Sequence, residues 1–325
     1  MRAGGFILIL IIRERVHYCR IPYCNKLSYL RRMYYVVYGL LYLLSLLPLR
    51  VLYIFSDLAY VIIYYIRGYR KEVVLNNLKI AFPEKTEKER IRIAKDFYRN
   101  FTDTFIEAIK LISASKKEIE KRSTGDFELI NSLIARGRNI HLMLGHQFNW
   151  EFANLSYAIH LNIPFVAVYM PLSNKIFDKI FYNLRSRYGT ILTPATNFRN
   201  QMHSVFTKQY ILGLAADQNP GGAEIGYWMN FFNKPVPFIK GPGKGAVKNN
   251  TAVVFIGFKK IKRGYYEFKV TLLAENGSDY TPEQLTVTYR NVLEETIRKD
   301  PANYLWSHRR WKWQWKEEYK KYWAE

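Results

Sequence analysis

The feature that most constrains the fold is an alternation of short apolar runs with longer amphipathic stretches, which begins at Arg138 and continues through most of the remaining chain. Short apolar runs bounded by turn residues are typical of buried strands, and apolar residues three or four positions apart are typical of helices. The alternation predicts strands at 138–144, 164–170, 190–193 and 210–216, and helices at 150–161, 174–187 and 197–208. Helices between consecutive strands predict an α/β fold with a largely parallel sheet.

The last part of the sheet is expected to be antiparallel. Apolar runs at 251–259 and 266–273 are separated only by a short turn around residues 262–264, which predicts a hairpin. A helix is expected to follow at 282–298. Two amphipathic helices are also expected before the sheet, at 71–82 and 87–112. The sequence therefore predicts an α/β fold in which helices flank a mixed sheet.

The first strand of the series ends in a turn that carries a histidine and a carboxylate. Gly145 is expected to form the turn and Asn149 to cap the helix at 150–161. His146 then stands at the carboxyl end of the strand, and Glu151 lies in the first helical turn, where the helix dipole favours a negative charge. Ligands and substrates of open α/β sheets usually bind at that edge.

A histidine whose ring is held by a carboxylate can act as a general base. We therefore predict that Glu151 orients His146. The chain has no Gly-x-Ser-x-Gly elbow and no cysteine near this turn, so the activated nucleophile is expected to belong to the substrate. On spacing alone, a structural loop histidine beside a helix-capping carboxylate is an equally good interpretation.

Further charged residues are candidates for the same site. Arg185 and Arg187 lie near the end of an expected helix and could hold a phosphate or an oxyanion, or serve only as favourable cations at a helix C-terminus. Asp217 and Gln218 end the strand at 210–216 and are expected to reach the same sheet edge. There Asp217 could orient His146 or Arg185, or only cap the following loop.

Several blocks of sequence resemble a known enzyme family. The segment His146-Gln147-Phe148-Asn149-Trp150-Glu151 is similar to the His-x4-Asp/Glu block of glycerolipid-type acyltransferases, and its last four residues resemble the bacterial lipid A biosynthesis (lauroyl/myristoyl) acyltransferases. Three later blocks follow in the family's order, at 216–218 with 231–232, at 241–243 and at 304–312. The similarity extends from about residue 33 to about residue 316.

The resemblance implies a membrane-bound enzyme that moves a fatty acyl chain from an acyl carrier protein thioester to a hydroxyl of a lipid A precursor. It implies the glycerolipid-acyltransferase-like fold, no cofactor, no metal, and a location on the cytoplasmic face of the bacterial inner membrane. Arg309 and Arg310 match the family's closing block, where a structural or substrate-phosphate role is implied. Other acceptors remain open, namely another glycolipid, a lysophospholipid or an amino lipid. A membrane-anchored binding protein without activity is the alternative from another class.

The N-terminal part is expected to contact a membrane. Between Arg32 and Arg67 lie 34 almost continuously apolar residues, interrupted near the middle by Pro48. A single span needs about 20 residues. We therefore expect a membrane-inserted helix at 33–47 and a second, interfacial or returning helix at 51–66. Basic residues at both ends favour a monotopic hairpin, with a single span or a buried pair of helices in a soluble domain as the alternatives.

These considerations divide the chain into three parts. Residues 1–32 form a basic extension, unless translation starts at Met33; residues 33–66 form a membrane anchor; residues 67–325 form the acyltransferase domain. Cys19 and Cys24 are the only cysteines and are expected to be free thiols in a reducing compartment rather than metal ligands.

The chain carries a net charge of +22, from 49 Lys and Arg against 27 Asp and Glu. This charge suits nucleic acid, an anionic membrane or an acidic protein partner. The long apolar runs favour the membrane, and no helix-turn-helix, zinc-finger or RNA-binding signature supports nucleic acid. Anionic lipids and an acidic acyl carrier protein are therefore the expected partners. The aromatic stretch 221–239 is expected either to line a hydrocarbon groove or to form core.

Overall fold

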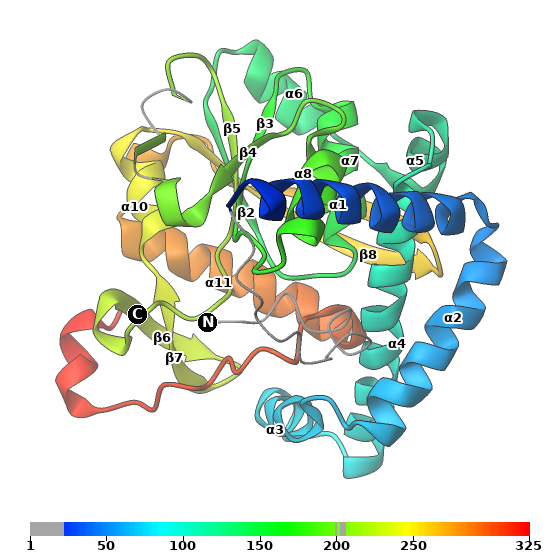
Figure 1. The fold of residues 1–325 in the computed structure, drawn as a ribbon. Coiled ribbons are helices and arrows are strands. Elements are labelled where there is room, and N and C mark those ends of the chain that lie inside the picture. The colour runs from blue at the N-terminus through cyan, green and yellow to red at the C-terminus, as the bar shows by residue number, and fades with distance from the viewer. Residues whose placement is uncertain (1–22, 199, 202–205) are drawn as a thin grey trace.

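A seven-stranded sheet with the strand order β1-β9-β8-β2-β5-β3-β4 forms the centre of the computed structural model, which describes residues 23–198, 200–201 and 206–325 (Figure 1). Most of the extension expected at 1–32 and part of the helix expected at 197–208 lie outside the described residues. The strands of this sheet are β1 (Ser123–Gly125), β2 (Ile140–Leu144), β3 (Phe165–Tyr169), β4 (Ile191–Pro194), β5 (Ile211–Ala215), β8 (Ala252–Lys262) and β9 (Tyr265–Ala274).

Helices cover both faces of the sheet, as the predicted alternation requires (Figure 1). Those after the N-terminal pair are α3 (Lys71–Ala81), α4 (Glu87–Leu111), α5 (Lys116–Arg122), α6 (Glu128–Ala135), α7 (Trp150–His160), α8 (Lys175–Ser186), α10 (Gly241–Lys248) and α11 (Pro282–Lys299). Within this seven-stranded sheet all strand pairs are parallel except β8 with β9, which form the predicted hairpin. The predicted α/β fold with a mixed sheet is confirmed.

The two faces of the sheet support two separate cores because successive strand side chains point to opposite sides. On β8, Val253 and Phe255 join the core that contains α11 and α4. Their neighbours Val254 and Ile256 join the core that contains α6 and α7. The central strands are therefore buried on both sides, which explains why they read as continuous apolar runs.

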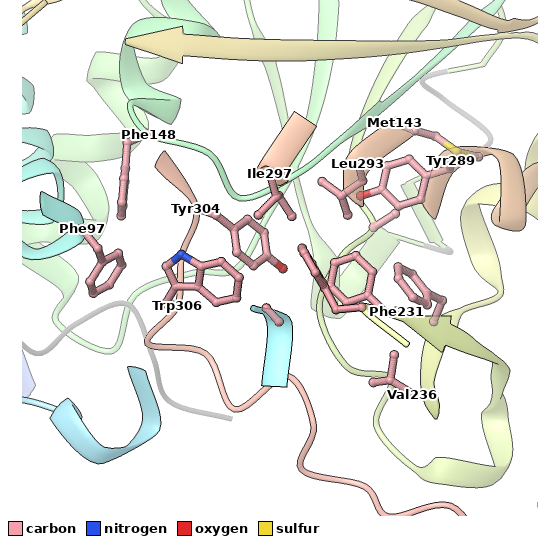
Figure 2. Packing of buried hydrophobic residues seen from close by; sticks show 14 of the residues in the cluster. Phe97, Met143, Phe148, Phe231, Val236, Tyr289, Leu293, Ile297, Tyr304 and Trp306 are labelled. Atoms are coloured by element: carbon pink, nitrogen blue, oxygen red, sulfur yellow. The ribbon is translucent and has the colours of Figure 1, made fainter. Parts of the chain in front are cut away.

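The aromatic stretch at 221–239 contains a second, two-stranded sheet formed by β6 (Gly226–Phe231) and β7 (Lys234–Ile239). Trp228, Phe231 and Phe238 are fully buried there. Figure 2 shows Phe231 and Tyr289 of α11 in the same, larger core, where Phe238 contacts both rings. Of the two interpretations of this stretch, the structure supports core packing.

The N-terminal part forms two helices that meet at Pro48. Helix α1 (Tyr23–Leu46) is followed by α2 (Leu49–Val61), which a π-helical turn at Ile62–Ile66 continues. The break at Pro48 agrees with the predicted interruption, although α1 begins earlier than expected. Leu49–Ile66 is long and apolar enough to cross a membrane, judged by length and composition.

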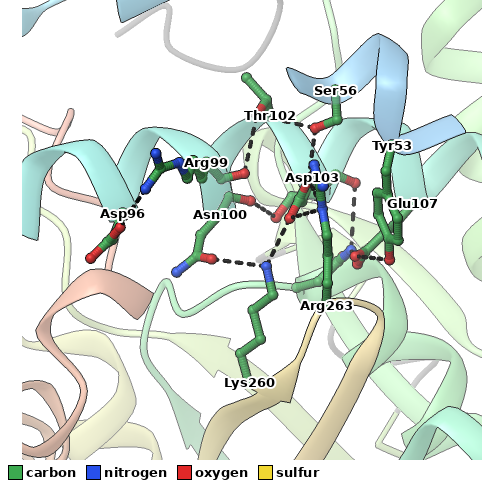
Figure 3. Close-up of polar contacts among 12 residues, drawn as sticks. Tyr53, Ser56, Asp96, Arg99, Asn100, Thr102, Asp103, Glu107, Lys260 and Arg263 are labelled. Atoms are coloured by element: carbon green, nitrogen blue, oxygen red, sulfur yellow. Dashed lines mark hydrogen bonds and ion pairs between the residues drawn. The ribbon is translucent and has the colours of Figure 1, made fainter. Parts of the chain in front are cut away.

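Both N-terminal helices lie against the domain rather than projecting from it (Figure 1). Helix α1 contacts α4 and α8, and α2 runs along α4. Polar contacts fasten α2 along its length: Tyr53 donates a hydrogen bond to Glu107 over 2.9 Å, and Ser56 donates one to Asp103 over 2.7 Å (Figure 3). The outer faces of both helices expose large apolar side chains, including Val36, Leu40, Leu43, Ile54, Phe55, Leu58 and Ile62.

Candidate active site

His146 and Asp217 meet because they follow two adjacent parallel strands. The register of β2 and β5 pairs Leu144 with Ala215, and the Ala216 N–H donates to the Leu144 carbonyl over 3.1 Å. The strand ends therefore coincide, and His146 and Asp217 each lie just past the end of a strand. The Asp217 Oδ1 is 2.6 Å from the His146 Nδ1, and the His146 backbone N–H donates to Oδ2 over 3.0 Å.

This pair determines which ring nitrogen of His146 is free to accept a proton. An ionised carboxylate only accepts hydrogen bonds, so Nδ1 carries the hydrogen and Nε2 keeps its lone pair in the neutral ring. Gln218 Nε2 lies 3.0 Å from that second nitrogen. The His146 side chain is 26% exposed, whereas that of Asp217 is 1% exposed. The ring of His146 is thus partly exposed, while the carboxylate that holds it is buried.

The electrostatics of the pair favour an ionised Asp217 and a basic His146. Burial raises the pKa of the Asp217 carboxyl, but the charge of His146 and its hydrogen bonds outweigh burial and lower that pKa to about 2. Burial lowers the pKa of the His146 ring, but the charge of Asp217 and its hydrogen bond outweigh burial and raise that pKa above its ordinary value. Asp217 therefore stabilises the imidazolium that would form during general base catalysis.

Glu151 has a different partner from the one expected. Its carboxylate binds the guanidinium of Arg185, with Nη2 2.5 Å from Oε1 and Nε 2.9 Å from Oε2. Because α7 begins at Trp150, Glu151 lies within its first turn and reaches the neighbouring helix α8, while the end of β5 brings Asp217 to the ring of His146. The prediction that Glu151 orients His146 is wrong in this structure, since Asp217 holds the ring.

The Glu151–Arg185 pair is a fork of the kind that fixes a guanidinium in one orientation. Glu151 is 3% exposed and Arg185 is 21% exposed, so the positive charge lies at the edge of a buried region. The third guanidinium nitrogen, Nη1, makes no hydrogen bond to a described residue. Arg187, the other candidate, is exposed and donates to the Leu111 carbonyl at the end of α4 over 3.1 Å. Only Arg185 of the two is held by a buried acid.

A buried carboxylate that the sequence interpretation missed supports the turn before α7. Asn149 is the N-cap of α7, and its Oδ1 accepts the backbone N–H of Glu151 over 3.0 Å. The Asn149 amide donates in turn to Glu107 Oε2 over 3.0 Å. Glu107 also accepts from Tyr53 of α2 and from Tyr266 of β9. One acidic residue on the buried face of α4 thus connects α2 with the turn before α7.

Arg310 lies under the loop that contains Gln218. It is 1% exposed, and its Nη1 donates to the Asn219 side chain over 2.8 Å and to the Pro237 carbonyl over 3.0 Å. Its Nε and Nη2 have no hydrogen-bond partner among the described residues. Burial lowers the pKa of this guanidinium to about 10, although the charge of Asp217 acts in the opposite direction.

Two further residues of the closing block are arranged differently. Arg309 is exposed, and only its backbone carbonyl, which accepts the Asn219 side chain over 2.7 Å, joins the site. His308 Nε2 accepts the Asn219 backbone N–H over 3.4 Å, and burial lowers the pKa of its ring to about 4. Among the described residues, no three His, Cys, Asp or Glu side chains are grouped as metal ligands.

Comparison with known proteins identifies the family. A model of the bacterial lipid A biosynthesis acyltransferases matches residues 23–313, which is most of the chain. The chain belongs to this family. It is 21% identical over 247 residues to the lipid A biosynthesis palmitoleoyltransferase of Escherichia coli strain K12, covering 75% of this chain and 79% of the relative. It is equally similar to the lipid A biosynthesis acyltransferase of Shigella flexneri.

Membership confirms the resemblance found in the sequence and shows that the protein is an acyltransferase. It supports acyl transfer in lipid A biosynthesis and a lipid A-type substrate. The family is membrane-associated, in agreement with the exposed apolar faces of α1 and α2. The alternative of a membrane-anchored binding protein without activity is therefore set aside.

Proposed function

We propose that this acyltransferase moves a fatty acyl chain from a carrier thioester to a hydroxyl of a lipid A precursor, with His146 as general base. The observation that carries the proposal is the pair formed by the His146 ring and the buried Asp217, which leaves Nε2 as the accepting nitrogen. General base catalysis needs a neutral ring with a fixed tautomer and a stabilised protonated form, and this pair supplies both.

In the proposed reaction, the acceptor hydroxyl attacks the thioester carbonyl while its proton moves to His146 Nε2. The tetrahedral intermediate then collapses, and the imidazolium returns the proton to the leaving sulfur, which departs as a thiol. An alcohol is too weak an acid to ionise beforehand, so the proton transfer accompanies the attack. Proton transfer of this kind contributes roughly 10²–10⁴-fold to the rate.

Glu151 acts in this proposal as a positioning residue for Arg185. The fork between them holds the guanidinium in place, and Nη1 remains available for a phosphate of the acceptor or for the developing oxyanion. Arg310 is too deeply buried to meet a lipid phosphate without movement, and we assign to it the support of the loop at Asn219. Arg187 and Arg309 are expected to contribute little to substrate binding.

We propose acyl carrier protein as the acyl donor. Such carriers are acidic, and the net charge of +22 would steer an acidic partner to the enzyme. The same charge would attract anionic lipids at the membrane surface, so the charge alone does not separate the two attractions. A direct comparison of carrier and coenzyme A thioesters is needed to identify the donor.

We further propose that the anchor lies flat on the cytoplasmic face of the inner membrane. A helix that crosses the bilayer by itself would have to separate from the rest of the protein. In the structure, Tyr53, Ser56 and Asp57 of α2 instead bind side chains of α4 and of the β8–β9 turn. The exposed apolar faces of α1 and α2 are then available to enter one leaflet. Replacing Leu58 by Glu is expected to reduce co-sedimentation with anionic vesicles, and unchanged binding would contradict this arrangement.

The test of the catalytic proposal is acyl transfer by membranes that contain the protein. Lauroyl-acyl carrier protein and lauroyl-CoA are offered separately with a labelled lipid A precursor, for wild type and for His146→Ala. Transfer should fall by at least about a hundredfold in the variant. If the wild-type protein transfers no acyl chain to this acceptor, the proposed acceptor is wrong. Other glycolipids, lysophospholipids and amino lipids would then be tested as acceptors. A variant that stays active would refute the role of His146.

A further inference from the structure

The side chain of Gln218 occupies the position at which a substrate hydroxyl must bind. Its Nε2 lies 3.0 Å from the His146 Nε2, the nitrogen that accepts the proton in the proposed reaction. Since Nδ1 donates to Asp217, Nε2 of the neutral ring can only accept, so the Gln218 amide must be the donor. An amide N–H and an alcohol O–H offer the same group to this lone pair, and the two cannot bind it at once.

The loop around Gln218 is fastened on both sides, whereas its side chain is held by one contact. Asp217 before it is bound to His146, and Asn219 after it is bound to Arg309 and Arg310. Among the described residues, the Gln218 side chain makes no hydrogen bond other than the one to His146. The side chain can therefore turn away from the ring while the backbone of the loop keeps its place.

We infer that Gln218 is a displaceable cap that keeps the base of His146 from activating water until an acceptor hydroxyl takes its place. This inference rests on the proposed function, because it concerns the same nitrogen. A bound acyl thioester is open to attack by water as well as by the acceptor. In hydrolysis, water attacks the thioester carbonyl and its proton passes to His146 Nε2. The imidazolium then returns that proton to the leaving sulfur, so a fatty acid and a free thiol are released.

The test measures free thiol release from lauroyl-acyl carrier protein and lauroyl-CoA when no acceptor lipid is present. Gln218→Ala removes the cap, and Gln218→Met keeps a side chain of similar length without the amide. Both variants should hydrolyse donor about fivefold faster than wild type, the factor that one hydrogen bond of ordinary net strength is worth. The ratio of transfer to hydrolysis, measured with acceptor present, should fall in both.

Three results would overturn the inference. If hydrolysis rises only in Gln218→Ala, the side chain excludes water by its bulk and the hydrogen bond is not the cause. If hydrolysis rises in neither variant, the Gln218 side chain does not restrain His146 from activating water. If hydrolysis rises equally when His146→Ala is added to either variant, the water is not activated by His146. Loss of transfer in the single His146→Ala variant tests the proposed function separately, so failure of the cap and failure of the base are distinguishable.

Discussion

Two buried aspartates in this enzyme have similar burial and very different surroundings. Asp103 on α4 is 2% exposed, and Asp217 after β5 is 1% exposed. Asp103 accepts from Lys260 over 2.9 Å, from Arg263 over 2.7 Å and from Ser56 (Figure 3). Among the residues that the structure describes, Asp217 forms an ion pair with no Lys or Arg, and its partner is the titratable ring of His146.

The difference shows how a buried charge can serve structure or chemistry. Around Asp103 both cations are bound to the carboxylate, and the cluster joins α2, α4 and the β8–β9 hairpin. Around Asp217 the partner ring is partly exposed, and two nitrogens of the nearby buried Arg310 have no hydrogen-bond partner within the described part of the chain. Fully paired buried charges hold elements together, while partly paired ones are common at sites where charge moves during reaction.

The largest effect should come from Asp217→Asn, which keeps the side-chain shape and removes the charge. We expect transfer to fall by roughly 10²–10⁴-fold, because the tautomer of His146 and the stability of its protonated form are both lost. Initial rates of labelled acyl transfer provide the measurement, and circular dichroism shows whether the fold is kept. Full activity in a folded variant would mean that Asp217 is only structural.

The matched change at the other aspartate, Asp103→Asn, should affect stability instead. Removing one partner from a buried ion-pair network leaves Lys260 and Arg263 without their shared counter-charge, which typically costs about 3–5 kcal/mol. Thermal unfolding measures the loss, and kcat/KM of the folded fraction should stay close to that of wild type, because Asp103 contacts none of the proposed site residues. If kcat/KM falls while Tm is unchanged, Asp103 would have a catalytic role, and the contrast with Asp217 would be wrong.

The two arginines of α8 form the next test. Arg185→Ala leaves Glu151 buried without its partner and removes the positive charge proposed for substrate, so we expect KM to rise and transfer to fall by about tenfold or more. Arg187→Ala removes contacts with the end of α4 and with the ring of Tyr188, and it serves as the control. Equal losses in both variants would contradict the assignment of the substrate charge to Arg185.

The smallest effect is expected from Tyr53→Phe, which removes a single hydrogen bond between α2 and Glu107 of α4. A loss of about 1 kcal/mol in the free energy of unfolding is expected. Denaturant titration measures this loss, with Tyr53→Leu as a comparison that also removes the ring. A loss of activity much larger than the loss of stability would show that α2 influences the catalytic turn through Glu107.

Much of the fold could be predicted because the local signals agree with the final packing. The strand before His146, the cap at Asn149 and the β8–β9 hairpin each follow from short-range patterns, and the structure confirms them. The hairpin of β6 and β7 was missed, since its many aromatic residues gave no clear alternation and Pro235 and Pro237 interrupt it. Its position is determined by packing against α11 and the C-terminal segment.

The sequence predicted which residues lie at the candidate site better than it predicted which of them contact each other. His146 and Asp217 were expected at one sheet edge because both end apolar strands, but the strand order that makes β2 and β5 neighbours is a long-range property. Glu151 is close to His146 in the sequence and was therefore the expected partner of its ring. In the structure, Asp217 is the carboxylate that contacts the ring. Glu107 could have been found from helical periodicity, because it lies three positions after Thr104 and four before Leu111, which are both buried on α4.

The most direct test of the central claim is the pH dependence of kcat/KM for wild type and for Asp217→Asn. His146 must be neutral to act as a base, so activity should rise with pH through the pKa of its ring. Since Asp217 raises that pKa, the wild-type acid limb should lie above the ordinary histidine value of about 6.5. In Asp217→Asn the protonated ring of His146 loses this stabilisation, so its pKa falls. The acid limb of the pH profile should therefore move to lower pH, and kcat/KM at its plateau should also decrease. An acid limb that stays in place in the variant would contradict the account.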